Sequence, residues 1–218
     1  MHQKKLLIVT GPQGSGNHLF SRILSLDPLV KGWEELLHKY WVPSDQEPFA
    51  EYWVYPERLT AEVFQDKDYF FANVSCPFFY DSVRRIPKIL EVANVAHNLG
   101  VEVEIAIVVR DQNINKEQQL RVRKEHTTPI AQDYYYNTLM SSKFPVHFID
   151  HEAFFLHGKH YLKWLSRILD FPIAYDDPAV MNFVTEDANH KYIKHVDHHW
   201  LDEEILRGSH TKLSERVK

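Results

Sequence analysis

Three glycines in a short loop are the residues of this chain best suited to binding chemistry. An apolar run at residues 6–9 leads into the loop, which contains Gly11, Gly14 and Gly16, and a helical pattern of apolar residues begins at Leu19. Glycines allow the backbone to curl its N–H groups inward, and the start of a helix adds unpaired N–H donors and a partial positive charge. Strand, glycine-rich turn and helix start therefore predict an anion-binding site.

The loop differs from the nucleotide-hydrolase version at two positions. The pattern GxxxxGK[ST] fits Gly11 and Gly16, but Asn17 and His18 stand where a lysine and a serine or threonine are expected. The lysine of that pattern grips phosphate, and the hydroxyl binds magnesium. The loop therefore predicts a phosphate-rich ligand that is bound without a metal.

Length and composition are typical of a globular domain. The chain has 218 residues, of which 44% are hydrophobic and 25% charged, and a formal net charge of −5. This charge argues against a general nucleic-acid-binding protein, because covering phosphates needs a basic excess. The single cysteine, Cys76, excludes an internal disulfide and is typical of a reducing compartment. No segment reaches the ~18 apolar residues of a membrane span, so we expect a cytoplasmic protein.

Apolar runs alternate along the chain with segments of helical periodicity, which is the pattern of an α/β fold. We expect a mostly parallel central sheet with helices on both faces, a three-layer α/β/α arrangement like that of the P-loop NTPases, in a single domain of residues 1–218. The expected strands are residues 5–10, 69–76, 101–109 and 146–149, and the expected helices are residues 17–26, 83–98, 115–126, 130–141 and 158–169.

Two segments lack a clean period. Residues 31–66 are rich in tryptophan, tyrosine and proline, and we expect short helices and loops that cover the edge of the sheet and help to form a pocket. Residues 180–218 are polar and rich in histidine. The spacing of His195, His198 and His199 matches no familiar zinc pattern, which favours a solvated segment over a metal site.

Four runs of sequence share features with one enzyme family. They are GSGNHL at 14–19, DPLVKGWEE at 27–35, IVVRD at 107–111, and VHFIDHEAF at 146–154, which a helix and Phe171-Pro172 follow. These runs resemble the glycine loop, the "HPDV…EE" segment, the strand followed by Arg-Asp, and the "(Y)EDL" turn of the sulfotransferases, and are closest to the tyrosylprotein and bacterial types. Sulfotransferases move a sulfonate from 3′-phosphoadenosine-5′-phosphosulfate (PAPS) to an acceptor and leave 3′-phosphoadenosine-5′-phosphate (PAP).

The resemblance implies which residues bind PAPS. The 5′-phosphosulfate would be held by the loop, namely by Gln13, Gly14, Ser15, Gly16, Asn17 and His18, through backbone N–H groups and the Ser15 and Asn17 side chains. Arg110 would bind the 3′-phosphate, with Gln118 in the place of a family serine. In structural terms alone, Ser15 and Asn17 could instead cap the first helix, and Arg110 could pair with Asp111. No metal is implied.

The loop lacks the cation that sulfotransferases usually place two residues before the loop glycine, because Gly14 stands there. Gln13, His18, Arg22 or a basic side chain from elsewhere could substitute. The helix dipole disfavours protonation of His18, so we expect a neutral donor there, or simply a residue of the first turn.

The general base is expected from a pair of glutamates. The resemblance favours Glu35, with Glu34 in reserve, and partial burial would raise the pKa of such a carboxylate toward a useful value. Adjacent glutamates in a loop are also common as solvated surface residues. The histidine used by cytosolic members has no counterpart, since the corresponding strand ends in residues 73–76, NVSC. Three tyrosines and three tryptophans either line an acceptor pocket or pack in the core, namely Tyr134, Tyr135, Tyr136, Trp33, Trp41 and Trp53.

These features together predict a sulfotransferase-like enzyme that acts on a hydroxyl of a small molecule or glycan. One alternative is a small-molecule or nucleotide kinase of the same fold, disfavoured by the missing lysine and hydroxyl. The other is a nucleotide-binding protein with weakened or lost turnover, which the glycine at position 14 motivates.

Overall fold

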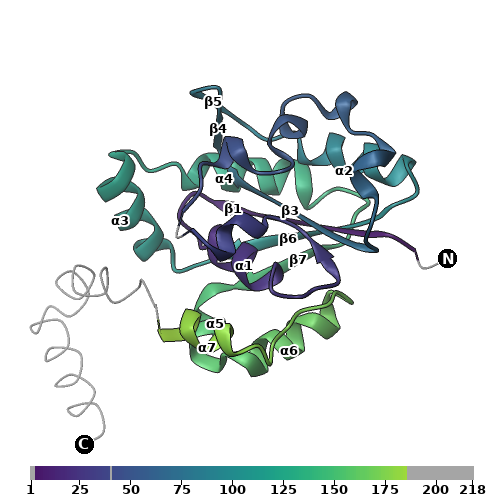
Figure 1. Ribbon diagram of the computed structural model, residues 1–218. Coiled ribbons are helices and arrows are strands. Elements are labelled where there is room, and N and C mark those ends of the chain that lie inside the picture. The colour runs from purple at the N-terminus through teal and green to yellow at the C-terminus, as the bar shows by residue number, and fades with distance from the viewer. Residues whose placement is uncertain (1–2, 40, 186–218) are drawn as a thin grey trace, which may run out of the picture.

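A five-stranded sheet forms the centre of the protein. The computed structural model describes residues 3–39 and 41–185, and its strands lie in the order β2-β3-β1-β6-β7 with every neighbouring pair parallel (Figure 1). This arrangement confirms the expected α/β class and parallel sheet. The strands are β1 (Lys5–Pro12), β2 (Val30–Lys31), β3 (Tyr69–Cys76), β6 (Glu102–Val109) and β7 (Val146–Asp150).

The two central strands, β1 and β6, are apolar on both faces. Residues 6–9 and 105–108 are buried, and Leu6 lies opposite Phe70 on β3 and Val103 on β6. A strand covered on both faces has no reason to alternate apolar and polar residues, so it reads as a continuous apolar run. This is why the sequence identified β1 and β6 so clearly.

One face of the sheet is covered by helices from both ends of the described chain. Side chains of Leu7, Val9 and Val108 point to this face and share a core with Phe20 of α1 and Leu162 of α6. Figure 1 shows α5, α6 and α7 together below the sheet. The helices of this layer are α1 (Asn17–Leu24), α5 (His151–His157), α6 (Lys159–Ile168) and α7 (Pro178–Thr185).

The opposite face packs against α2 (Ile89–Asn98) and α4 (Thr128–Tyr134), which continues as the π-helical turn η6 (Tyr135–Leu139). Side chains of Ile8 and Ile105 share this second core with Val92 of α2 and Ala131 of α4. Since successive residues of a strand point to opposite faces, the two cores use alternate positions of the same strands.

The irregular segment wraps around the β3 edge of the sheet and contributes to both cores. Trp33 belongs to the core on the α1 face, whereas Trp53 and Phe64 belong to the other. Aromatic edge-to-face contact between Phe64 and Phe70 joins the segment to β3. The segment contains five 3-10 helices, η1 (Glu34–Leu37), η2 (Ser44–Gln46), η3 (Ala50–Trp53), η4 (Pro56–Arg58) and η5 (Ala61–Phe64).

The expected helix at residues 83–98 was wrong in its first part. Val83–Arg85 forms strand β5, which pairs antiparallel with β4 (Phe78–Tyr80), and α2 begins only at Ile89. The two residues between the strands, Asp81 and Ser82, have positive φ values of 50° and 60°. Such a pair of left-handed residues makes a tight hairpin turn. The helical spacing of apolar residues after this turn had favoured a helix from residue 83.

Other element bounds also differ from those expected. Helix α3 (Gln112–Arg123) starts three residues early because the Asp111 carboxylate accepts the backbone N–H groups of Asn113 and Ile114, at 2.9 Å each. Helix α4 starts at Thr128 rather than at residue 130, and β2, α5 and α7 were not expected. His195, His198 and His199 lie outside the described residues, and no helix among those described is long and apolar enough to cross a bilayer.

A buried carboxyl group completes the edge of β3. Strand β2 pairs only with the first two residues of β3, and beyond it Glu47 accepts the backbone N–H of Asn73 at 3.2 Å. Its other oxygen accepts the indole N–H of Trp53 at 3.0 Å. Burial raises the pKa of Glu47 to about 8, although these hydrogen bonds act in the opposite direction.

We expect Glu47 to make the protein less stable as pH rises. Because its pKa is about 8 in the folded state against an ordinary 4.5, the folded state holds the proton more tightly, and the stability this confers is lost between those pH values. The loss from about pH 5 to about pH 8 amounts to roughly 3–4 kcal/mol. Urea unfolding of the wild type and of Glu47→Gln at both pH values measures it, with the exposed Glu57→Gln as control. Identical pH dependence of wild type and Glu47→Gln would contradict the assignment.

Candidate functional site

The glycine loop lies at the carboxyl end of β1 and leads directly into α1. Gly14 and Gly16 have φ values of +83° and +107°, which side chains rarely adopt, and the N–H of Ser15 bonds to the carbonyl of Pro12 at 3.0 Å. Gly16 is the N-cap of α1, so the first N–H groups of the helix point toward the loop without carbonyl partners within the helix. The backbone therefore has the strand, glycine turn and helix start that the sequence predicted.

The side chains of Ser15 and Asn17 hold the loop together. The Ser15 hydroxyl donates to Asn17 Oδ1 at 3.1 Å, and Asn17 Nδ2 donates to the Ser75 hydroxyl at 2.9 Å and to the Gly11 carbonyl at 3.3 Å. Both side chains are buried, and the N-cap position makes no side-chain hydrogen bond. Ser15 and Asn17 thus join the loop to the ends of β1 and β3, and their side chains bond within the protein.

Arg110, at the end of β6, lies against the loop. Its Nη1 donates to the Gly14 carbonyl at 2.6 Å and to Gln118 Oε1 at 2.5 Å. A side chain on Gly14 would meet Asn115 Oδ1 and the Gln118 amide, each 3.1 Å from the position of a Cβ atom. The structure therefore brings together Arg110 and Gln118, the two residues predicted to bind one phosphate. Side chains of α3 also lie beside Gly14, where the loop lysine or arginine is missing.

Two of the suggested replacements for the missing cation are engaged elsewhere. Gln13 is buried, its carbonyl accepts Gln119 Nε2 at 2.6 Å, and its side-chain oxygen accepts the Thr127 hydroxyl at 3.2 Å. The Arg22 guanidinium carbon lies 4.3 Å from the centre of the Phe183 ring. Gln13 carries no charge, and the Arg22 guanidinium stacks on an aromatic ring of α7.

The third suggested replacement, His18, is a neutral imidazole. Its ring is half-buried and meets the edge of Trp33 with a centroid distance of 5.3 Å. Burial, with a smaller effect from the nearby charge of Arg123, lowers the pKa of His18 to about 4. The expectation of a neutral donor agrees with this value, but its main cause is burial rather than the helix dipole. Of the residues considered, Arg110 is the one that brings a positive charge to Gly14.

His151 is a part of the site to which sequence reasoning assigned no role. It is buried at the end of β7, and a Cβ atom on Gly16 would lie only 2.5 Å from its Cδ2. Its Nδ1 is 3.4 Å from Glu152 Oε1, and Glu152 Oε2 accepts the Asp111 backbone N–H at 3.2 Å. The position of His151 directly after a parallel strand was the available signal, since such positions share one edge of the sheet.

Glu152 remains ionised at this junction. Burial raises the pKa of Glu152, but its hydrogen bond to His151, the charge of His151 and the charge of Arg110 outweigh burial and lower the pKa below its usual value. A carboxylate held ionised between two basic side chains fixes their positions electrostatically. Arg110, His151 and Glu152 thus connect the ends of β6 and β7 to the loop.

The two glutamates predicted as general base lie on the surface. Glu34 and Glu35 occupy η1, both are exposed, and Glu35 Oε2 lies 3.4 Å from Lys39 Nζ. The partial burial expected of a tuned base is not observed at either residue. Among the aromatic residues named above, Trp33 and Trp53 are buried in the two cores, whereas Trp41 is exposed.

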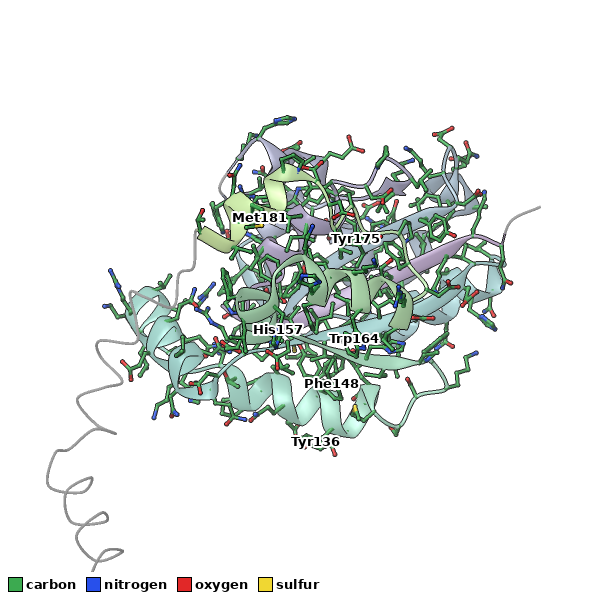
Figure 2. The ribbon with its side chains drawn as sticks, turned by 90° about the horizontal axis from the view of Figure 1, so that it is seen from below. Tyr136, Phe148, His157, Trp164, Tyr175 and Met181 are labelled. Atoms are coloured by element: carbon green, nitrogen blue, oxygen red, sulfur yellow. The ribbon has the colours of Figure 1, made fainter. Side chains whose placement is uncertain are left out.

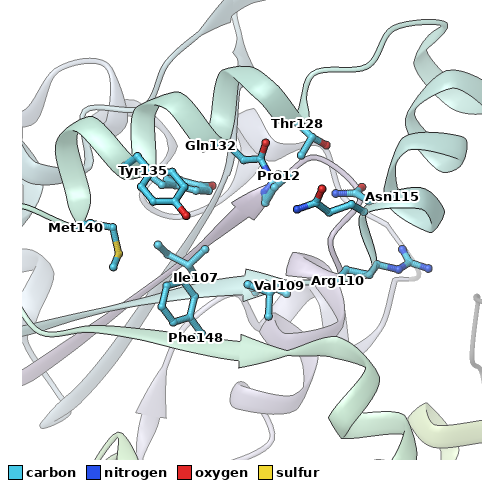
Figure 3. Close-up of a pocket in the computed structure, with 13 residues that line it drawn as sticks. Pro12, Ile107, Val109, Arg110, Asn115, Thr128, Gln132, Tyr135, Met140 and Phe148 are labelled. Atoms are coloured by element: carbon cyan, nitrogen blue, oxygen red, sulfur yellow. The ribbon is translucent and has the colours of Figure 1, made fainter.

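A pocket of about 220 Å³ opens beside the loop, between β6, β7 and the helices α3 and α4 (Figure 3). Strands β1 and β6 are neighbours, yet α1 after β1 and α4 in the connection from β6 to β7 cover opposite faces of the sheet. Ligands of open parallel sheets bind at such a point, beyond the carboxyl ends of the strands. The residues that line the pocket are Pro12, Ile107, Val108, Val109, Arg110, Gln112, Asn115, Thr128, Gln132, Tyr135, Tyr136, Met140 and Phe148.

We expect Gly16→Ala to disturb the loop through two effects, backbone strain and contact with His151. Gly100 is a matched control, because it has a φ of +81° and nothing within 4 Å of its Cβ position. Gly100→Ala should cost about 1–2 kcal/mol of unfolding free energy from strain alone. Gly16→Ala should cost roughly 1–3 kcal/mol more in urea unfolding. If the extra cost persists in a His151→Ala background, the contact is not its cause.

We expect His18 to titrate far below an ordinary histidine. Its NMR titration should give a pKa near 4. Arg123→Gln removes a like charge and should raise the pKa, though not to the ordinary value of 6.5, because burial remains. Arg121→Gln, on the same helix, serves as control and should leave the titration unchanged. A His18 pKa near 6.5 in the wild type would contradict the neutral-donor assignment.

Neither of two comparisons with known proteins assigns this chain to a family. A scan of protein-family models finds none that matches the chain. A search of the curated proteins finds no significant match either.

Proposed function

We propose that this protein is a sulfotransferase that moves a sulfonate from PAPS to a hydroxyl acceptor, on a fold of the P-loop NTPase-like kind. The observation that carries the proposal is the contact of Arg110 with the Gly14 carbonyl at 2.6 Å. It places a guanidinium at a glycine loop that has no lysine of its own. The four sequence runs that resemble sulfotransferases supply the choice of donor.

Arg110 and the loop divide the binding of the donor between them. The backbone N–H groups of Gly16, Asn17 and His18 hold the 5′-phosphosulfate, as helix starts hold phosphates elsewhere, since the N–H of Ser15 bonds to the Pro12 carbonyl. Arg110 is a planar donor suited to bidentate contact with phosphate oxygens. Its place at both Gly14 and Gln118 lets one guanidinium bind the 3′-phosphate and add positive charge near the transferring group.

The transfer itself is a substitution at sulfur. The acceptor oxygen forms a bond to sulfur while the bond from sulfur to the bridging oxygen of the 5′-phosphate breaks, so PAP leaves with that electron pair. The acceptor proton goes to Glu35 or to water. Positioning and electrostatic stabilisation carry most of the catalysis in such transfers. Neutral His18, in the first turn of α1, donates a hydrogen bond to the developing charge.

Calorimetric titration with PAP, beside ATP with magnesium, tests the donor. We expect PAP to bind and Arg110→Ala to weaken binding roughly 10- to 100-fold, because hydrogen bonds to charged groups contribute about 1.5–3 kcal/mol. Arg58→Ala is the matched control, since Arg58 lies on η4 and stacks on Tyr55. Arg110→Lys separates loss of charge from loss of the planar guanidinium.

Three outcomes would contradict parts of the proposal. Binding of magnesium ATP without binding of PAP would favour a kinase. Equal affinity for PAP in the wild type and Arg110→Ala would remove Arg110 from the site. Tight PAP binding without sulfonate transfer to any of a panel of hydroxyl acceptors would leave a nucleotide-binding protein.

A further inference from the structure

The pocket beside the loop has two apolar walls that face each other. One wall comes from β6 and β7 and the other from the end of α4 and η6, and Figure 3 shows side chains from both directed into the space between them. Two facing walls of this kind accommodate a flat ring. The sheet contributes Ile107, Val109 and Phe148, and the helical wall contributes Tyr135, Tyr136 and Met140.

The π-helical turn shapes the second wall. Tyr135 and Leu139 of η6 are buried in the core, whereas Tyr136 and Met140 stay largely exposed. An additional residue per turn changes which side chains face the sheet, and π-helical turns occur frequently at functional sites. Local widening of α4 at the pocket is therefore an independent sign that this wall serves a ligand.

The deep part of the pocket offers an occupant little to hydrogen-bond. The hydroxyl of Tyr135 already pairs with the Thr10 hydroxyl at 3.1 Å, and burial raises the pKa of Tyr135 well above 10. Arg110 is the one charged side chain among the 13 lining residues. A heterocyclic base or a sugar would leave its polar edges unpaired there, at about 1–3 kcal/mol for each group. A carbocyclic ring carries no such cost.

Polar groups gather at the other end of the pocket, beside the loop. Pro12 belongs to both the pocket lining and the strand that enters the loop, and Arg110, Asn115, Thr128 and Gln132 lie near it (Figure 3). An occupant with its ring between the walls and a single hydroxyl at this end would present that hydroxyl toward the phosphate-binding backbone. The pocket is thus matched to a molecule with one polar end.

The volume of the pocket limits the part of the acceptor that fits between the two walls. A cavity of 150 Å³ holds one benzene ring, so about 220 Å³ suits one ring or two fused rings. The outer rim is open, because Phe148 is 52% exposed, and Phe148 and Tyr136 lie near each other on the face shown in Figure 2. A substituent on the ring can therefore reach solvent.

We propose that this pocket binds the ring of the acceptor, and that the acceptor is a small, uncharged carbocyclic alcohol or phenol rather than a glycan. The inference rests on the proposed function, because the polar end of the pocket opens toward the loop that would hold the donor. An ionisable phenol also suits a site whose candidate bases, Glu34 and Glu35, are exposed.

The test uses 2-naphthol as the probe and follows its fluorescence as the full-length protein is added, with and without saturating PAP. We expect saturable binding under both conditions, and none for N-acetylglucosamine measured by calorimetry. Met140→Gln, at the rim of the pocket, should weaken naphthol binding roughly 5- to 10-fold, because a polar side chain then replaces one apolar residue of the wall. Met181→Gln, an exposed methionine on α7, is the matched control and should leave it unchanged. PAP affinity should be the same in both variants.

Two results would overturn the inference. Competition between naphthol and PAP would mean that the pocket holds the base of the nucleotide. Absence of naphthol binding to protein that does bind PAP would mean that the acceptor ring lies elsewhere, while the proposed function stands. Failure of the proposed function is read separately, from the PAP titration of the wild type.

Discussion

The close packing of the glycine loop against the ends of β6 and β7 is the constraint on which the site depends. Gly14 lies beside Gln118 and Asn115 and accepts a hydrogen bond from Arg110, while Gly16 packs on His151. A Cβ atom on Gly16 would clash with His151, and one on Gly14 would make tight contacts of 3.1 Å with the Asn115 and Gln118 side chains. The loop therefore keeps its left-handed residues, and the side chains that would ordinarily come from the loop come from the neighbouring strand ends instead. The positive charge at Gly14 comes from Arg110, directly after β6.

A second buried contact ties the loop to the pocket. Gln119, which is fully buried, donates to the Gln13 carbonyl at 2.6 Å and accepts the backbone N–H of Thr127 at 2.7 Å. It also accepts the N–H of Thr128, the first residue of α4, at 3.2 Å. One amide thus joins the glycine loop to the helix that forms a wall of the pocket. Since buried polar groups are costly to leave unpaired, this amide fixes the spacing between the loop and the pocket.

Arg110 contacts the loop, and the charge of Arg123 acts on His18 in the first turn of α1. Burial keeps His18 neutral, and Glu152 stays ionised beside Arg110 and His151. The loop thus combines the Arg110 guanidinium, the backbone dipoles of a helix start and a neutral imidazole. Under the proposed function, directed donors rather than a large net charge would bind the phosphate-rich ligand, since the overall charge is −5.

The sequence by itself determined the α/β class, four of the five strands of the sheet, and the loop of Gly14 and Gly16, because buried parallel strands and positive φ values leave local signals. Its position directly after an apolar strand also made Arg110 a candidate for the site. Tertiary structure alone decided the β4–β5 hairpin, the partners of Arg110, the place of His151 beside Gly16, and the pocket. Each depends on side chains that are far apart in the chain, such as Gly16 and His151, and meet only because parallel strands end at one edge of the sheet. Local propensity cannot encode such a contact, since it arises from strand order rather than from neighbouring residues.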